Sequence, residues 1–333
     1  MNTYPSAVLD KFRAAYSASQ AALIPFKGGY ESSDGILYRF KEDNPDRLVK
    51  VMFLGKAQSR EALLRFESRL KFVDFLQRKG VRVIEPLLSL NDELYETVED
   101  ENGTWVAYAM RRINGKTMSP TVWDPNSVQK WGQLIGKLHR VTQDYPDWEY
   151  CSDPVTSERY LTWQSEWENF HNLCKEWDIR EKWEQIGEEL KALPINRNAF
   201  GFIHNDPHLW NLLVDGDNVT LLDFDVANHH WFVNDIAIAC QHLLSMVSGG
   251  LDQPIHHRER LVDFLREFLK SYYRENDLSQ EWLDHLDLFY AYRRILLYLV
   301  MEGWRKSKPA LQESWKNMIL TRPEILGKVD FHR

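Results

Sequence analysis

Apolar residues change their spacing along this chain of 333 residues, and the change predicts two differently built parts. In the first part, apolar residues at every fourth position predict a helix over residues 5–18, and strand-like runs follow over 36–40 and 47–54. Residues 59–79 carry an apolar stripe at three- and four-residue spacing, which predicts a longer helix. This order is typical of a small unit that mixes strands and helices.

A β-hairpin is predicted next, because strand-like residues 95–98 and 104–110 flank Glu101-Asn102-Gly103, a turn sequence. Residues 81–88 lead toward one further strand. From Pro125 onward the spacing becomes mostly helical. Helices are predicted over residues 125–140, within 156–193, and over 235–249, 256–275 and 279–302.

Short strands interrupt these helices. Residues 200–203 and 212–214 are apolar and strand-like, residues 215–218 have the composition of a turn, and residues 219–224 predict another strand. Residues 204–211 therefore form a loop between two strands, which is where site residues are usually presented. The whole chain is predicted to be α+β, with a mixed part followed by helices around this hairpin.

The loop carries the pattern H-x-D-x-x-x-x-N, with His204, Asp206 and Asn211, and Asp223 follows at a strand end. Phosphoryl transfer to a hydroxyl needs a carboxylate that accepts the hydroxyl proton, and an Asn and a second Asp that hold the magnesium ion bridging the phosphates. All of these residue types stand here in the order that kinases have. The alternative is structural: a buried histidine, with an Asp and an Asn that only form turns.

Lys50 lies within an apolar strand, where a buried lysine is costly unless it is paired. Kinases use such a strand lysine to contact the nucleotide phosphates, and they pair it with a helix glutamate. Glu67 falls within the apolar stripe of its helix and is the predicted partner, whereas Glu61 lies on the flank. The alternative is an edge strand in which Lys50 points to water.

Composition narrows the classes of function. The formal net charge of −8 argues against a general nucleic-acid or anionic-membrane binder, and 44% apolar residues permit a sizeable core. The three cysteines lack metal-ligand spacing, and an odd, sparse count fits a reducing compartment. We find no signal-peptide pattern and no apolar run long enough to span a bilayer, so a soluble, cytoplasmic protein is expected.

On these residues the chain resembles the aminoglycoside phosphotransferase and choline kinase superfamily, the small-molecule branch of the protein-kinase-like fold. The motifs that carry the resemblance are His204-Asn205-Asp206 through Asn211, Leu222-Asp223-Phe224-Asp225 and Asn234-Asp235-Ile236-Ala237. The resemblance implies a two-lobed α+β fold. A nucleotide-binding lobe with an antiparallel sheet and a helix would cover residues 1–110, and a mainly helical catalytic and acceptor-binding lobe would cover residues 111–333.

The resemblance also implies a role for each matched residue. Asp206 would orient and deprotonate the acceptor hydroxyl while His204 braces its loop, and Asn211 and Asp223 would hold Mg²⁺. The implied cofactors are ATP and Mg²⁺. The residues implied to bind the nucleotide are Lys50, Glu67, Gly28, Gly29, Ser32, Ser33, Met110, Arg111, Arg112 and Ile113. The glycine and serine residues would cover the triphosphate, although most glycine-rich loops are only turns, and the last four would contact the adenine.

Three features depart from the family pattern or add to it. Asn205, Pro207 and His208 replace the commonest Gly-Asp-Leu pattern of the catalytic loop. Residues 228–231, Asn-His-His-Trp, replace a small glycine-containing turn; we expect them to shape the acceptor pocket or to pack, rather than to bind a metal. Asp235 is expected to cap the helix that follows it and to tie that helix back to the loop.

In this family a C-terminal helix lines the acceptor cleft. There, Asp284, Asp287 and Tyr290 would suit an amine, whereas Arg293 and Arg294 would suit a carboxylate. For any single pair, a solvated helix face is the favoured interpretation. The predicted activity is ATP- and Mg²⁺-dependent phosphorylation of a small-molecule hydroxyl, aminoglycoside-, choline- or homoserine-like. The alternatives are a protein Ser/Thr kinase of the same fold and a non-catalytic nucleotide-binding module. A homodimer is left open.

Overall fold

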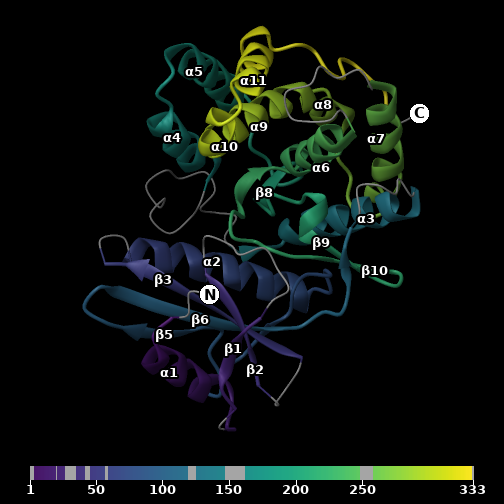
Figure 1. Ribbon diagram of the computed structural model, residues 1–333. Coiled ribbons are helices and arrows are strands. Elements are labelled where there is room, and N and C mark those ends of the chain that lie inside the picture. The colour runs from purple at the N-terminus through teal and green to yellow at the C-terminus, as the bar shows by residue number, and fades with distance from the viewer. Residues whose placement is uncertain are drawn as a thin grey trace. The chain divides into compact units, whose positions relative to one another are not determined.

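The computed structural model describes residues 4–19, 21–26, 35–41, 46–56, 59–118, 125–146, 162–247 and 258–331. The predicted phosphate loop with Gly28, Gly29, Ser32 and Ser33 lies outside these residues, as does the stretch 156–161 that was expected to be helical. The chain divides into two compact units, Met1–Gly115 and Lys116–Arg333, and each is described by itself (Figure 1).

The N-terminal unit is built on a six-stranded antiparallel sheet. Its strands run in the order β1-β2-β3-β6-β4, and β5 pairs with β6. They are β1 (Leu23–Pro25), β2 (Ile36–Phe40), β3 (Arg47–Gly55), β4 (Pro86–Leu87), β5 (Glu96–Glu99) and β6 (Gly103–Arg111). The two helices are α1 (Ser6–Tyr16) and α2 (Ser59–Arg78). The predicted hairpin and both predicted helices are confirmed, whereas β1 was not predicted.

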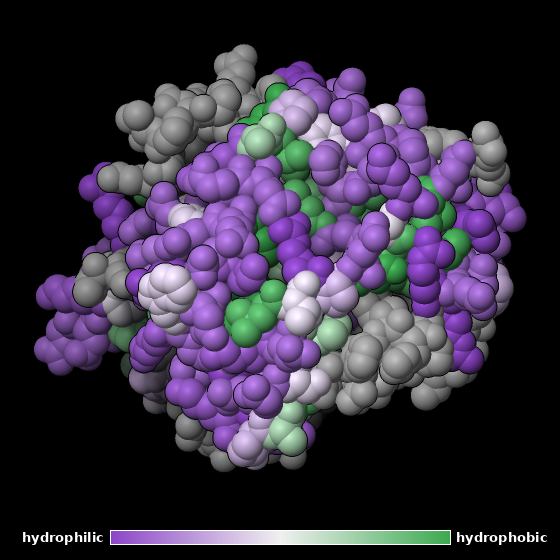
Figure 2. All heavy atoms as spheres, turned by 90° about the horizontal axis from the view of Figure 1, so that it is seen from above, coloured by the Kyte–Doolittle hydropathy of each residue, from purple (hydrophilic) through white to green (hydrophobic). Residues whose placement is uncertain are grey.

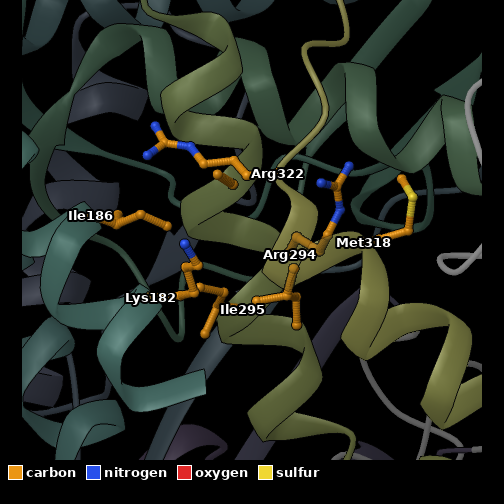
Figure 3. A pocket seen from close by; sticks show the side chains of 8 residues that line it. Lys182, Ile186, Arg294, Ile295, Met318 and Arg322 are labelled. Atoms are coloured by element: carbon orange, nitrogen blue, oxygen red, sulfur yellow. The ribbon is translucent and has the colours of Figure 1, made fainter. Parts of the chain in front are cut away.

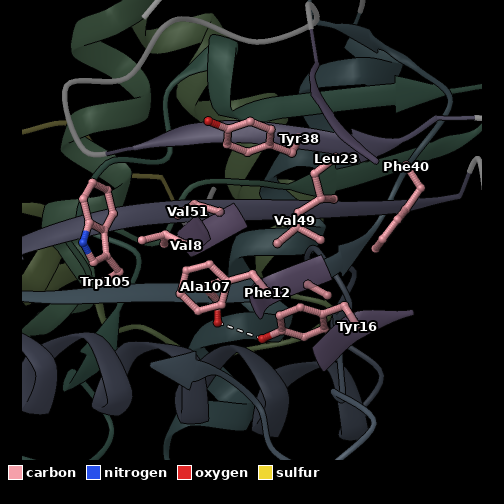
Figure 4. Packing of buried hydrophobic residues seen from close by; sticks show 11 residues of the cluster. Val8, Phe12, Tyr16, Leu23, Tyr38, Phe40, Val49, Val51, Trp105 and Ala107 are labelled. Carbon is pink, nitrogen blue, oxygen red and sulfur yellow. Dashed lines mark hydrogen bonds between the residues drawn. The ribbon is translucent and has the colours of Figure 1, made fainter. Parts of the chain in front are cut away.

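One face of this sheet packs against α1 (Figure 4). Phe12 and Tyr16 of α1 bury their rings against Val49 and Ala107, whose side chains point to the same side of the sheet. The Tyr16 hydroxyl donates a 2.7 Å hydrogen bond to the Ala107 carbonyl. Because burial raises the pKa of Tyr16, this phenol stays protonated and remains a donor.

The C-terminal unit is mainly helical and holds two small sheets. Its helices are α3 (Pro125–Thr142), α4 (Trp163–Leu173), α5 (Trp177–Lys191), α6 (Phe232–Val247), α7 (Arg258–Tyr272), α8 (Gln280–Leu283), α9 (Leu286–Val300), α10 (Glu302–Lys306) and α11 (Pro309–Thr321). One sheet has the order β10-β9-β7, from strands Asn218–Leu221, Leu212–Asp215 and Lys116–Thr117. The other pairs β8 (Phe200–Ile203) with β11 (Asn228–Trp231).

Two glycines allow α3 and α7 to pack backbone against backbone. A Cβ atom on Gly132 would lie 2.1 Å from the Phe268 carbonyl oxygen, and one on Gly136 would lie 2.6 Å from the Tyr272 carbonyl oxygen. Both distances are far below van der Waals contact, so only glycine fits at either position. This close approach brings His139, one turn farther along α3, within 2.9 Å of the Tyr272 hydroxyl.

The structure corrects several predicted boundaries in this unit. The strand predicted over 219–224 ends at Leu221, and α6 begins at Phe232 rather than near residue 235. Residues 228–231, for which no strand was predicted, form the fully buried strand β11, because β8 supplies a hydrogen-bonding partner for them. The helix predicted over 279–302 is broken between α8 and α9, and α11 was not predicted.

The surface seen in Figure 2 is mostly hydrophilic, and hydrophobic residues gather in small separate clusters. The described residues include a few large exposed apolar side chains on different elements, among them Leu173, Trp177, Trp210 and Val300. Single exposed apolar residues of this kind are normal for a folded chain. Across the described ranges, every helix is too short or too polar to cross a bilayer.

Candidate active site

The loop that connects β8 to β9 is held by a buried carboxylate. The backbone N–H groups of His204 and Asn205 donate to the two oxygens of Asp235 at 3.2 and 2.8 Å. Asp235 lies in the first turn of α6 and is completely buried. It therefore ties α6 to the loop, as predicted, but its carboxylate accepts from loop N–H groups and does not cap its own helix, which begins at Phe232.

His139 completes this buried anchor. Its Nε2 lies 3.2 Å from an Asp235 oxygen and its Nδ1 lies 2.9 Å from the Tyr272 hydroxyl, while its ring stacks on Phe232. Burial lowers the pKa of His139 although Asp235 acts in the opposite direction, so the ring stays neutral near pH 7. The imidazole therefore holds the Asp235 carboxylate in place without adding a second charge to the interior.

His204 joins the loop to the strand that precedes Asp223. Its side chain is fully buried, its Nδ1 accepts from the backbone N–H of Asp206 at 3.1 Å, and its Nε2 donates to the Leu222 carbonyl at 2.8 Å. Burial lowers the pKa of His204, which favours the neutral ring that these two bonds require. His204 is thus a positioning residue for the loop.

Asp206 has one oxygen against Arg293 of α9 and the other 3.3 Å from His208 Nε2. Its side chain is 23% exposed. Burial alone would raise the pKa of Asp206, but the guanidinium of Arg293 and then the His208 ring outweigh burial and bring the pKa to about 2. The carboxylate is therefore ionised at neutral pH, and it accepts a proton poorly while Arg293 stays in contact.

Asn211 and Asp223 are brought to the same end of the β9-β10 hairpin. Asn211 ends the short 3₁₀ helix η3 (Leu209–Asn211), and its Nδ2 donates to the Asp206 carbonyl at 3.0 Å. Its own carbonyl accepts from Leu222 N–H at 2.8 Å, directly before Asp223. Asp223 is exposed and has a left-handed backbone, with φ of 62°.

This donor set suits a hard divalent cation. The bond from Asn211 Nδ2 leaves the amide oxygen of Asn211 for a metal, and the Asp223 carboxylate offers a second oxygen ligand. Within the described ranges, no cluster of three or more His, Cys, Asp or Glu side chains is arranged to hold a metal alone. Magnesium commonly takes only one or two protein ligands and completes its shell with phosphates and water, so the two residues fit that ion.

A second polar network lies beneath the loop and was not predicted from the sequence. Glu166 of α4 accepts from Asn205 Nδ2 at 2.6 Å and from the Tyr292 hydroxyl of α9 at 2.6 Å. Asn205 Oδ1 in turn accepts from Asn234 at 2.8 Å. Asn205 has φ of 65°, a conformation that glycine adopts freely and asparagine tolerates. The side chain that replaces glycine here is therefore used to tie the loop to α4.

In the N-terminal unit, Lys50 is buried on the face of the sheet opposite α1. It pairs across strands with Leu37 and Tyr108, so these three side chains share one face. α2 covers that face, with the Phe66 ring 5.4 Å from Tyr108 (Figure 1). Lys50 is thus in the interior of the sheet rather than on an edge strand, which excludes the alternative reading of that residue.

Glu67 lies on α2 next to Phe66, and its carboxylate makes a 2.6 Å ion pair with Lys71 one turn along the same helix. Its pairing with Lys50 stays a prediction. The segment predicted to contact adenine, residues 110–113, begins with the last two residues of β6. Met110 is buried there, whereas Arg111 pairs with Glu85 at 2.5 Å and its guanidinium is turned to that partner. The adenine contacts of residues 110–113 also remain a prediction.

The fold and the loop geometry agree with one protein family. A family model described as the phosphotransferase enzyme family matches residues 23–292, most of the chain. The chain belongs to the phosphotransferase enzyme family. It is therefore a small-molecule kinase, an enzyme that transfers a phosphoryl group to an alcohol, and the nucleotide use expected from its motifs agrees with this membership.

Relatives of this phosphotransferase include amicoumacin kinase from Bacillus subtilis (strain 168), which is 25% identical over 270 residues, 80% of this chain and 76% of that protein. Among solved structures, amicoumacin kinase hAmiN in complex with AMP-PNP, Ca²⁺ and Ami superposes with a TM-score of 0.81 at 21% identity, covering 98% of this chain and 96% of that one. A microcompartment-associated aminopropanol kinase gives a TM-score of 0.64 at 18% identity, with 95% of each chain covered. The predicted protein-kinase-like α+β fold is confirmed.

The five residues of the phosphotransferase that were predicted to line the acceptor cleft have different surroundings. Arg293 contacts Asp206. Asp287 instead accepts backbone N–H groups of residues 325–327, and Asp284 accepts from Gln280. Both oxygens of Asp287 are thus used in structural hydrogen bonds, whereas Asp284 is exposed, and the amine-binding role considered for the pair stays a prediction.

Tyr290 and Arg294 are buried away from the loop. Tyr290 is 1% exposed and packs beside Cys240 of α6, and burial raises the pKa of its phenol. Arg294 is 6% exposed and lines a small pocket between α5, α9 and α11, together with Lys182 and Arg322 (Figure 3). Burial lowers the pKa of Arg294 to about 10 despite the nearby Asp287, so it remains protonated at pH 7.

His229 and His230 belong to the core of the phosphotransferase. Both are at most 1% exposed in strand β11, and the His230 ring packs against Trp231, Phe289 and Tyr292. Burial lowers the pKa of His230 to about 3, so this ring is neutral. The prediction that these histidines pack rather than bind a metal agrees with this setting.

Proposed function

We propose that this phosphotransferase moves the γ-phosphoryl group of ATP, bound with Mg²⁺, to a hydroxyl of a small molecule. The observation that carries the proposal is the arrangement of Asp206, Asn211 and Asp223. Backbone and side-chain bonds hold a carboxylate, an amide and a second carboxylate at one end of the β9-β10 hairpin. Kinases use these three groups for the hydroxyl and for the metal.

In the proposed step, Asp206 accepts the proton of the acceptor hydroxyl. The hydroxyl oxygen bonds to the γ-phosphorus while the bond from that phosphorus to the β,γ-bridging oxygen breaks, and its electron pair leaves with ADP. Asn211 and Asp223 would hold Mg²⁺, which when bound neutralises phosphate charge. The residues proposed to bind the nucleotide are Lys50, Glu67, Gly28, Gly29, Ser32, Ser33, Met110, Arg111, Arg112 and Ile113.

The acceptor is proposed from the relatives. Because the Bacillus subtilis relative is named an amicoumacin kinase, amicoumacin is the first acceptor to test. Amino alcohols follow, because a fold neighbour is named an aminopropanol kinase. Aminoglycosides, choline, ethanolamine and homoserine complete the panel of small hydroxyl compounds, and a generic protein substrate tests the competing class of acceptor.

The test is ADP release from Mg²⁺–ATP with each acceptor, followed by identification of the phosphorylated product by mass. Stimulation by a small molecule that Asp206→Asn loses would support the proposal. Transfer to the protein substrate alone would assign the chain a protein kinase activity instead. Binding of Mg²⁺–ATP without stimulation by any acceptor would count against Asp206 as the base for these compounds.

A further inference from the structure

The carboxylate proposed as the general base, Asp206, is bound by Arg293 in this structure. One oxygen of Asp206 contacts the Arg293 guanidinium, and the other lies 3.3 Å from His208 Nε2. A general base must have an oxygen within hydrogen-bond reach of the hydroxyl that it deprotonates. A carboxylate can still accept from a hydroxyl beside these two contacts, but the Arg293 guanidinium lowers its pKa and makes it a weak base, so turning Arg293 away makes Asp206 a better proton acceptor.

The helix that carries Arg293 is fixed, so the change must come from the side chain. The neighbouring Tyr292 donates to Glu166 at 2.6 Å, and its ring stacks on Trp183 of α5 at 4.8 Å. Near the start of the helix, Asp287 binds backbone N–H groups of residues 325–327. Arg293 is 12% exposed at its side chain, and its long stem permits a turn toward a ligand beside Asp206.

The charges beside Asp206 define what such a ligand can be. The contacts described for Asp206 come from Arg293 and His208, both of which donate hydrogen bonds. The acidic residues Asp284 and Asp287, which would attract an amine, make their hydrogen bonds elsewhere. A guanidinium presents planar donors that match a carboxylate or an amide oxygen, whereas it repels an ammonium group.

We propose that Arg293 determines which acceptors this enzyme takes, by binding a carboxylate or amide oxygen next to the reacting hydroxyl. In turning to that oxygen, Arg293 releases Asp206 to accept the hydroxyl proton. The inference rests on the proposed function and names its substrate class: hydroxy acids and hydroxy amides, rather than compounds with an ammonium group beside the hydroxyl. Arg293 thereby couples recognition of the acceptor to release of the base.

Three probes with the same three-carbon diol skeleton test this directly: glycerate, glyceramide and 3-aminopropane-1,2-diol. Binding of each is measured by calorimetry without ATP, for the wild type, Arg293→Gln and Arg293→Lys. The wild type should bind the carboxylate and the amide at least about tenfold more tightly than the amine, as charge-assisted hydrogen bonds allow. Arg293→Gln should bind the three probes with similar affinities. Arg293→Lys should still bind the carboxylate more tightly than the amine, but should bind the amide no more tightly than the amine.

Lys182→Gln removes a positive charge from α5 in the same unit and serves as the control, because it should leave the order unchanged. Melting temperatures show that each variant is folded. Tightest binding of the amine, an order that survives Arg293→Gln, or no difference between the three probes would each overturn the proposal. Because binding is measured without ATP, failure of the catalytic proposal would appear separately, as absence of turnover with every acceptor.

Discussion

Two sets of polar contacts hold the catalytic loop: one is buried and binds its backbone, and the other is partly exposed and binds only the side chain of Asp206. On the buried side, Asp235 and His204 bind loop backbone groups and are completely enclosed. On the other side, Asp206 contacts Arg293 and His208 through side chains alone, and its carboxylate is 23% exposed. The buried contacts fix the position of the loop, whereas the side-chain contacts can exchange for contacts to an acceptor.

The comparison predicts its largest effect for Asp235→Ala. This change leaves two buried backbone N–H groups and His139 without their acceptor. The free energy of unfolding should fall by at least about 3 kcal/mol, because each of these three buried donors left without an acceptor costs about 1–3 kcal/mol. Denaturant titration measures it. Asp217→Ala is the matched control, since Asp217 is 95% exposed in its pair with Lys130 and should cost little. Equal losses of unfolding free energy in Asp235→Ala and Asp217→Ala would show that the buried contacts of Asp235 do not stabilise the fold more than an exposed ion pair does.

Asp223→Ala should affect turnover and leave the fold intact. Asp223 is exposed, so its loss should reduce the free energy of unfolding by no more than about 1–2 kcal/mol, the cost of holding alanine at a left-handed φ of 62°. As a proposed metal ligand, it should lower kcat at least about a hundredfold and raise the Mg²⁺ concentration needed for half-maximal rate. The measurement is a Mg²⁺ titration of ADP release. An unchanged Mg²⁺ requirement would show that Asp223 does not hold the metal.

The Asp206–Arg293 contact should make stability depend on acid pH. The pKa of Asp206 is about 2 in the folded chain, below its ordinary value of 3.8. A lowered pKa contributes stability above pH 4 that is lost as the pH falls from about 4 to about 2, and here it amounts to about 2 kcal/mol. Urea unfolding of the wild type and Arg293→Gln across this range measures it. If the free energy of unfolding falls by the same amount between pH 4 and pH 2 in both proteins, Arg293 is not the cause of the lowered pKa of Asp206.

Tyr292→Phe should have the smallest effect. It removes one donor to Glu166, which still accepts from Asn205 and Asn228. Unfolding should cost about 1 kcal/mol less than in the wild type, the usual value of one hydrogen bond. Turnover should fall only slightly, because the loop keeps its bonds to Asp235. A loss of turnover as large as that of Asp223→Ala would mean that Tyr292 acts in the chemistry.

The sequence predicted the elements and the loop because both depend on local patterns. Strand and helix spacing located β3, β6 and α2 to within a residue or two, and the H-x-D-x-x-x-x-N pattern located the loop. The exceptions depend on contacts between residues distant in the sequence. No strand was predicted over residues 228–231, because these residues form one only by pairing with β8, which no short-range pattern shows.

The partners of the site could not be predicted in the same way. Glu166 lies 39 residues from its partner Asn205, and Arg293 lies 87 residues from Asp206. Only tertiary packing makes Arg293, rather than Arg294, face Asp206. Both arginines stand on one helix turn in the sequence, and nothing local separates them. One sequence feature could have indicated this network. Asn205 stands where the family commonly has glycine, which is typical of a left-handed backbone, and its side chain is available for hydrogen bonds that glycine cannot make.

The most direct test of the account is transfer of labelled γ-phosphate from Mg²⁺–ATP to the best acceptor by Asp206→Asn, with its unfolding measured alongside. The account predicts a fall in kcat of at least about a hundredfold, as for loss of a general base, with ATP binding retained. Stability should fall by no more than about 2 kcal/mol, less than for Asp235→Ala. Turnover close to that of the wild type would contradict the assignment of Asp206 as the base.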